Sequence, residues 1–162
     1  QDAQRAIGLL RSNASKWNIN PNKIGVIGFS AGGFMVADVS THFKKRAYAP
    51  LDAADEVSTR PNFAIALYPG HMKRKDKAFI LNPRIQFTKE TPPTFIVQAQ
   101  DDPMDTIDYS LIYYIGLKKA GASADMHLYS KGGHAFGLRR TALPITNWPT
   151  LILPWLKSIN IV

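Results

Sequence analysis

The chain has 162 residues, of which 45% are hydrophobic, and its formal net charge is +8. This length suits a single domain, residues 1–162, and no apolar run reaches the roughly 18 residues that a membrane-spanning helix needs. The absence of cysteine excludes disulfide bonds, thiolate chemistry and cysteine zinc sites, but it does not indicate a compartment.

Helices and strands alternate along the chain. Small and apolar residues at helical spacing predict a first helix over 2–17, and Asn20 and Pro21 then begin a turn. Short apolar runs predict four strands, and helix-compatible stretches lie between or after them. The predicted strands are 24–29, 63–69, 94–100 and 124–130, and the further helices are 31–46, 105–120 and 147–159.

The first three strands are almost continuously apolar, which is typical of parallel strands covered on both faces, whereas 124–130 alternates like an edge strand. The element order therefore predicts an α/β fold with a mostly parallel sheet of about four strands flanked by helices. The stretch 70–93 interrupts this pattern with six basic residues and four proline or glycine residues. We expect a long excursion there that serves as a lid or rim.

Basic residues form short clusters at 44–46, 73–77 and 139–140. A nucleic-acid surface would place them along one element with aromatic side chains between them. These clusters instead fall at predicted helix ends and in a loop, which is typical of solvated charge. We therefore expect no nucleic-acid partner, and an acidic polysaccharide or cell-wall surface is the other use that this charge would suit.

The pentapeptide 28–32 reads Gly-Phe-Ser-Ala-Gly and joins the first predicted strand to the helix that follows it. In this context the pattern is typical of a nucleophile elbow, a turn so tight that the residues two positions from Ser30 must lack a Cβ. The elbow would expose the Ser30 hydroxyl and aim the Ala31 N–H at an oxyanion. The alternative is that Ser30 only caps the helix.

A serine nucleophile needs a base and an acid, which follow it in the order Ser, Asp, His in α/β-hydrolases. The third strand leads into Asp101 and Asp102, and the fourth leads into the loop that carries His134. Because parallel strands end at one edge of a sheet, these loops would meet beside Ser30. We predict a triad of Ser30, Asp102 and His134. Asp101 is the alternative acid, and Asp105 is better placed as a helix N-cap.

The other histidines have different interpretations. His42 falls late in a predicted helix and is expected to be exposed, and His127 is expected on the polar face of the fourth strand. His71 follows the second strand at the edge that carries the predicted triad, so we assign it, with Phe29, to the rim of a substrate site. No group of His, Asp and Glu has metal-ligand spacing, so we expect no metal and no cofactor.

Several segments carry a resemblance to a known family. They are IGVIGFSAGG at 24–33, LYPG at 67–70, TPPTF at 91–95, DDP at 101–103 and KGGHAFGLR at 131–139. In combination they resemble bacterial carbohydrate acetylesterases, the acetyl-xylan-esterase-like α/β-hydrolases related to feruloyl-esterase-like and lipase-like enzymes. The resemblance implies a cofactor-free serine esterase, secreted or periplasmic, that removes acetyl or other short acyl groups from polysaccharide sugars. It assigns the nucleophile to Ser30, the acid to Asp102 and the base to His134.

The chain departs from that family at its beginning. Family members carry further upstream strands and a His-Gly-Gly-Gly-type loop that supplies a second oxyanion N–H, whereas this chain starts with Gln1, at the helix before 24–29. We therefore expect the C-terminal portion of an α/β-hydrolase fold, as a fragment, a natural minimal form or one completed by a partner. Without upstream strands, 24–29 would form an exposed apolar edge, so we expect a homodimer there.

Two other functions fit the same motifs. A serine peptidase of the prolyl-oligopeptidase type shares the elbow and the order of the triad. A catalytically impaired hydrolase that serves as an interaction module would explain the missing oxyanion loop, although the intact order of Ser30, Asp102 and His134 argues against it.

Overall fold

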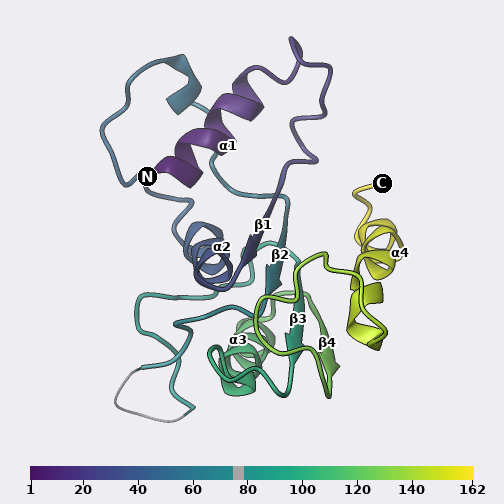
Figure 1. Ribbon diagram of the computed structural model, residues 1–162. Coiled ribbons are helices and arrows are strands. Elements are labelled where there is room, and N and C mark those ends of the chain that lie inside the picture. The colour runs from purple at the N-terminus through teal and green to yellow at the C-terminus, as the bar shows by residue number, and fades with distance from the viewer. Residues whose placement is uncertain (75–78) are drawn as a thin grey trace.

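A four-stranded parallel sheet forms the centre of the molecule in the computed structural model, which describes residues 1–74 and 79–162 (Figure 1). The strands lie side by side in chain order, so the predicted α/β fold with a parallel sheet of about four strands is confirmed. They are β1 (Gly25–Phe29), β2 (Phe63–Leu67), β3 (Thr94–Ala99) and β4 (Ala124–Tyr129).

The register of the sheet brings the carboxyl ends of neighbouring strands together. Phe29 pairs with Leu67 at the ends of β1 and β2, and Ala99 pairs with Tyr129 at the ends of β3 and β4. The loops that follow the four strands therefore leave the sheet at one edge, which is the arrangement that the candidate site requires.

Helices cover the two faces of the sheet (Figure 1). The helix α2 (Ala31–Thr41) and the helix α3 (Ile107–Ala120) pack on one face around buried residues such as Tyr113, which is fully buried. The 3₁₀ helix η2 (Pro144–Leu151) and the helix α4 (Ile152–Ser158) cover the other face. Burial on both faces explains why β2 and β3 are continuously apolar. The strand β1, by contrast, lies at the edge of the sheet and leaves Ile27 52% exposed, so the prediction that β1 is covered on both faces is wrong.

Three helices are shorter than their sequence patterns predicted. The first, α1 (Asp2–Ser12), does not reach residue 17, and α2 ends at Thr41 and not at residue 46. Beyond α2, the side chain of Gln4 donates hydrogen bonds to the carbonyls of His42 and Lys45, which therefore need no helical partner. The predicted helix over 147–159 is divided between the end of the 3₁₀ helix η2 (Pro144–Leu151) and the α-helix α4 (Ile152–Ser158). Pro149 lies within η2 and lacks the N–H group that an α-helical hydrogen bond would need there.

One 3₁₀ helix, η1 (Ala53–Asp55), was absent from the sequence-based prediction. It packs against α1, and its Asp55 carboxylate, fully buried, forms ion pairs with Arg5 and Arg46. The hydroxyl of Tyr48 donates a further hydrogen bond to the same carboxylate at 2.6 Å. These contacts fasten the segment between α2 and β2 to the N-terminal helix.

The excursion 70–93 packs against α3 over the part that the structure describes. Met72 and Ile85 are buried in the core, and the ring of Phe87 stacks on Tyr113 with centroids 5.1 Å apart. Its Lys73 ammonium forms an ion pair with Asp108 in the first turn of α3. Residues 75–78, including two basic residues of the predicted cluster, lie outside the described residues, and the role of the excursion as a lid or rim stays a prediction.

No helix in the described ranges is both long and apolar enough to cross a membrane.

Candidate active site

Ser30 occupies the sharp turn between β1 and α2, with φ 53° and ψ −118°. This positive φ is sparsely populated for residues with a Cβ, and neighbouring backbone holds it in place. The Ser30 N–H donates to the Leu67 carbonyl at 3.1 Å, and the Gly70 N–H donates to the Ser30 carbonyl at 3.1 Å. The turn is therefore anchored to the segment that follows β2.

The glycines of the elbow differ in what they permit. A Cβ on Gly28 would lie 2.2 Å from the Gly32 carbonyl oxygen, so the backbone of α2 approaches β1 as closely as the motif predicts. A Cβ on Gly32 itself would meet nothing within 4 Å, so the prediction that sterics exclude a side chain there is wrong. The second close approach belongs to Gly33, where a Cβ would lie 2.7 Å from Pro69.

The loops after β3 and β4 bring Asp102 and His134 together. The Nδ1 atom of His134 lies 2.9 Å and 3.1 Å from the two carboxylate oxygens of Asp102. Asp102 is buried, and its carboxylate also accepts hydrogen bonds from the backbone N–H groups of Met104 and Asp105. Such an acid can hold the imidazole in one tautomer, with Nε2 available for chemistry.

Asp101, the alternative acid, has a different contact. Its exposed carboxylate accepts hydrogen bonds from the N–H groups of Gly132 and Gly133, at 2.8 Å and 2.7 Å. Asp101 therefore ties the loop after β3 to the loop that carries His134 and does not bind the imidazole itself.

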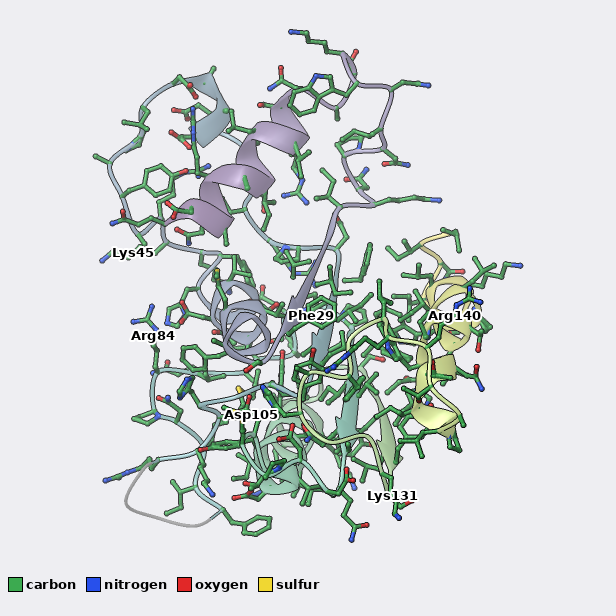
Figure 2. The ribbon with its side chains drawn as sticks, in the orientation of Figure 1. Phe29, Lys45, Arg84, Asp105, Lys131 and Arg140 are labelled. Carbon is green, nitrogen blue, oxygen red and sulfur yellow. The ribbon has the colours of Figure 1, made fainter. Side chains whose placement is uncertain are left out.

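Asp105 accepts a hydrogen bond from Ser30 and is not a helix cap, which corrects the sequence-based prediction. Its Oδ2 accepts a hydrogen bond from the Ser30 hydroxyl at 2.8 Å and lies 3.9 Å from His134 Nδ1. The N-cap of α3 is Thr106. The structure thus brings Asp102 to His134 and Ser30 to Asp105, with the Ser30 hydroxyl hydrogen directed at a carboxylate. Figure 2 labels Asp105 near the centre of the view, below the end-on helix α2.

A buried glutamine supports this loop and was not predicted. Gln98 on β3 is fully buried, and its Nε2 donates to the Asp105 carbonyl at 2.9 Å and lies 3.5 Å from Asp102 Oδ2. Its Oε1 accepts a hydrogen bond from Ser110 on α3 at 2.8 Å. The sequence signal was an amide inside an apolar strand, where a polar group needs buried partners.

Tyr68, directly after β2, forms an aromatic wall for the imidazole. Its ring meets those of His134 and Phe136 edge-on, with centroids 5.1 Å and 4.6 Å apart. Burial raises the pKa of Tyr68 above its usual value and outweighs a backbone hydrogen bond with Gly137, which acts in the opposite direction. The phenol therefore stays neutral. Phe29, which is 37% exposed, also contacts Tyr68, with ring centroids 6.0 Å apart.

The remaining predicted residues lie around this centre. Ala31 is the first residue of α2, whose N-terminal N–H groups lack acceptors within the helix. His71 is exposed, with φ 57°, and its ring meets Phe34 at 6.1 Å, so its rim role stays a prediction. The side chain of His42 is 45% exposed, as predicted.

His127 does not lie on a polar face, which corrects another prediction. Its ring packs against Phe95 with centroids 4.6 Å apart, and its Nε2 is buried without a hydrogen-bond partner. Burial lowers the pKa of His127, while Asp125 opposes the shift. The residue belongs to the packing of β3 on β4.

Over residues 1–74 and 79–162, no group of three or more His, Asp or Glu side chains could hold a metal ion. A hollow of about 260 Å³ flanks His134 and is lined by Phe136, Arg139, Leu143 and Ile145, among others.

Known proteins resemble this chain along nearly all of its length. The model of the prolyl oligopeptidase family matches residues 4–158. An acetylxylan esterase of Xylanibacter ruminicola is 30% identical over 158 residues, which cover 84% of this chain and 30% of that protein. An endo-1,4-beta-xylanase B of Butyrivibrio fibrisolvens is 28% identical, with 83% of this chain and 24% of that protein covered.

A solved structure agrees in fold. The acetyl ester-xyloside bifunctional hydrolase of Caldicellulosiruptor lactoaceticus superposes with a TM-score of 0.87 at 32% identity, over 99% of this chain and 65% of that one. The predicted α/β-hydrolase fold is therefore confirmed. The chain spans less than a third of the length of the two curated relatives.

Proposed function

Since the chain belongs to the prolyl oligopeptidase family, we propose that it is a serine hydrolase that cleaves short acyl esters of carbohydrates, with acetyl as the acyl group. The observation that carries this proposal is the pair formed by Asp102 and His134 beside the strained turn of Ser30. The acetylxylan esterase and the acetyl ester-xyloside hydrolase among its relatives support the choice of ester and sugar.

The proposed reaction starts with a turn of the Ser30 hydroxyl from Asp105 to His134 Nε2. His134 takes the hydroxyl proton while Oγ attacks the ester carbonyl, and Asp102, bound to Nδ1, stabilises the imidazolium that forms. The Ala31 N–H at the start of α2 binds the oxyanion. His134 then gives the proton to the sugar oxygen as its bond to the acyl carbon breaks, so the sugar leaves as an alcohol and the acyl group stays on Ser30. Water, activated by His134, hydrolyses this acyl-enzyme.

The surroundings of His134 support this assignment of roles. Tyr68 restrains the ring on one side, and the contact between Asp101 and the glycines at 132 and 133 fixes the loop that carries it. Because Tyr68 and Asp102 already hold the imidazole, its ring loses little further freedom when it accepts a proton. Such preorganisation lowers the activation barrier.

A labelling experiment tests the proposal. A fluorophosphonate probe should modify the unchanged chain and Ser123→Ala, an exposed serine far along the sequence, but not Ser30→Ala. Hydrolysis of 4-nitrophenyl acetate and release of acetate from acetylated xylan should follow the same pattern. Hydrolysis that survives Ser30→Ala would contradict the proposal.

The family model also favours a second function, a peptidase of the prolyl-oligopeptidase type. A peptide 4-nitroanilide assayed beside 4-nitrophenyl acetate separates the two, because a carbohydrate esterase should leave the amide intact. A chain that neither hydrolyses these substrates nor binds the fluorophosphonate would instead be a catalytically impaired hydrolase, for which the interaction-module hypothesis remains.

A further inference from the structure

An ionisable side chain outside the proposed triad touches Ser30, and the proposed reaction gives it no role. Asp105 accepts the Ser30 hydroxyl hydrogen bond at 2.8 Å, although Asp102 already serves as the partner of His134. The Asp105 side chain is only 14% exposed, so bulk water reaches little of the carboxylate that contacts Ser30.

Three contacts keep Asp105 at this place. Its N–H donates to Asp102 Oδ1 at 3.0 Å, and its carbonyl accepts from the Gln98 side chain at 2.9 Å. The backbone of Gly70 packs closely against the Asp105 carboxylate, because a Cβ on Gly70 would lie only 2.6 Å from Asp105 Oδ1. The carboxylate therefore has little room to withdraw from Ser30 when a substrate arrives.

We propose that Asp105 sets the charge selectivity of the site and excludes esters whose acyl group carries a negative charge. An acyl group bonded to Ser30 Oγ lies within a few bond lengths of this carboxylate. Like charges at such a distance repel strongly, and salt screens a mostly buried charge poorly. Neutral short acyl groups such as acetyl escape this repulsion. The inference rests on the proposed function and narrows its substrate class.

The test compares two esters of equal acyl length, 4-nitrophenyl butyrate and mono-4-nitrophenyl succinate, which adds a carboxylate. The unchanged chain should prefer the butyrate in kcat/KM. Asp105→Asn removes the charge but keeps the shape and both backbone hydrogen bonds, so it should reduce that preference by about tenfold or more. Asp125→Asn, an exposed position on β4, makes the same change in net charge and should leave the preference unaltered.

Each result decides between the alternatives. An unchanged preference in Asp105→Asn, or an equal loss with both esters, overturns the inference while the esterase assignment stands. Equal shifts in Asp105→Asn and Asp125→Asn overturn it too, because net charge alone would then explain the selectivity. If neither the unchanged chain nor the variants hydrolyse any ester or react with a fluorophosphonate, the proposed function fails and the inference fails with it.

Discussion

Gln98→Leu should destabilise the fold through the partners that Gln98 leaves behind. Leucine fills a similar volume, but it cannot accept the hydrogen bond of Ser110 or donate to the Asp105 carbonyl. The Ala99 carbonyl, which also accepts from the Gln98 side chain, keeps a second donor in the Asp102 N–H. Two polar groups therefore lose their partner, the Ser110 hydroxyl on α3 and the Asp105 carbonyl in the loop that carries Asp102.

The expected cost follows from the burial of these two groups. An unsatisfied buried polar group costs about 1–3 kcal/mol, and Ser110 is fully buried. The Asp105 carbonyl is only partly buried, so water can replace part of its lost bond and the low end of that range applies. The sum is about 2–4 kcal/mol in the free energy of unfolding, or on the order of 10 °C in Tm for a chain of this size.

Urea unfolding followed by circular dichroism measures this cost, and a double-mutant cycle identifies its cause. Ser110→Ala removes the other half of the bond and leaves Gln98 Oε1 unpaired, whereas the double variant leaves neither group unpaired. We expect the double variant to be more stable than the sum of the single effects by about 1 kcal/mol or more. Additive effects, or a cost of Gln98→Leu below about 1 kcal/mol, would refute the reasoning.

Further predictions concern the elbow, a buried histidine and the sheet edge. Gly28→Ala should lower the unfolding free energy by about 3 kcal/mol or more, because its Cβ would overlap the backbone of α2. The matched variant Gly32→Ala should be neutral or raise the unfolding free energy by up to about 1 kcal/mol. Equal costs for the two variants would contradict the geometry. Burial lowers the pKa of His127 in the folded chain, so as the pH falls His127 becomes protonated in the unfolded chain before it does in the folded chain. The usual pKa of histidine is about 6.5, so the unfolding free energy should fall between pH 7.5 and pH 5.5. In parallel urea titrations His127→Gln should show a smaller fall. An equal fall in the unchanged chain and in the variant would exclude His127 as the cause. We also propose a homodimer through the edge of β1, where Ile27 is 52% exposed. Sedimentation should show a dimer at micromolar concentration and a smaller dimer fraction for Ile27→Lys, and a monomeric unchanged chain would rule the dimer out.

The parallel sheet and the position of Ser30 were readable from local patterns. Continuous apolar runs mark β2 and β3 as strands covered on both faces, and Gly28 marks a close approach between strand and helix. The meeting of Asp102 with His134 could also be anticipated, because both follow strands that end at one edge of the sheet. Their catalytic roles, like that of Ser30, remain proposals.

The contacts that local patterns missed all depend on how distant segments pack. Asp105 precedes a helix, so sequence reasoning made it a cap, but the tertiary fold turns its side chain to a residue 75 positions earlier. His127 shares alternate positions along β4 with Asp125 and Tyr129, which suggested a polar face, but across the sheet its ring meets the aromatic ring of Phe95. The room around Gly32 likewise depends on backbone placement that the G-x-S-x-G spacing does not specify.

The positive φ of Ser30 creates a conflict between the proposed activity of this chain, which needs a serine at this turn, and its folding stability. Holding a residue with a Cβ at such angles costs about 1–3 kcal/mol, which glycine at the same position would recover apart from about 0.5–1 kcal/mol of extra chain entropy. Selection for a well-folded chain alone would thus favour loss of the nucleophile. A serine that persists at this turn in a lineage would record selection for chemistry, and stability screens of variants of this protein should be expected to enrich inactive ones.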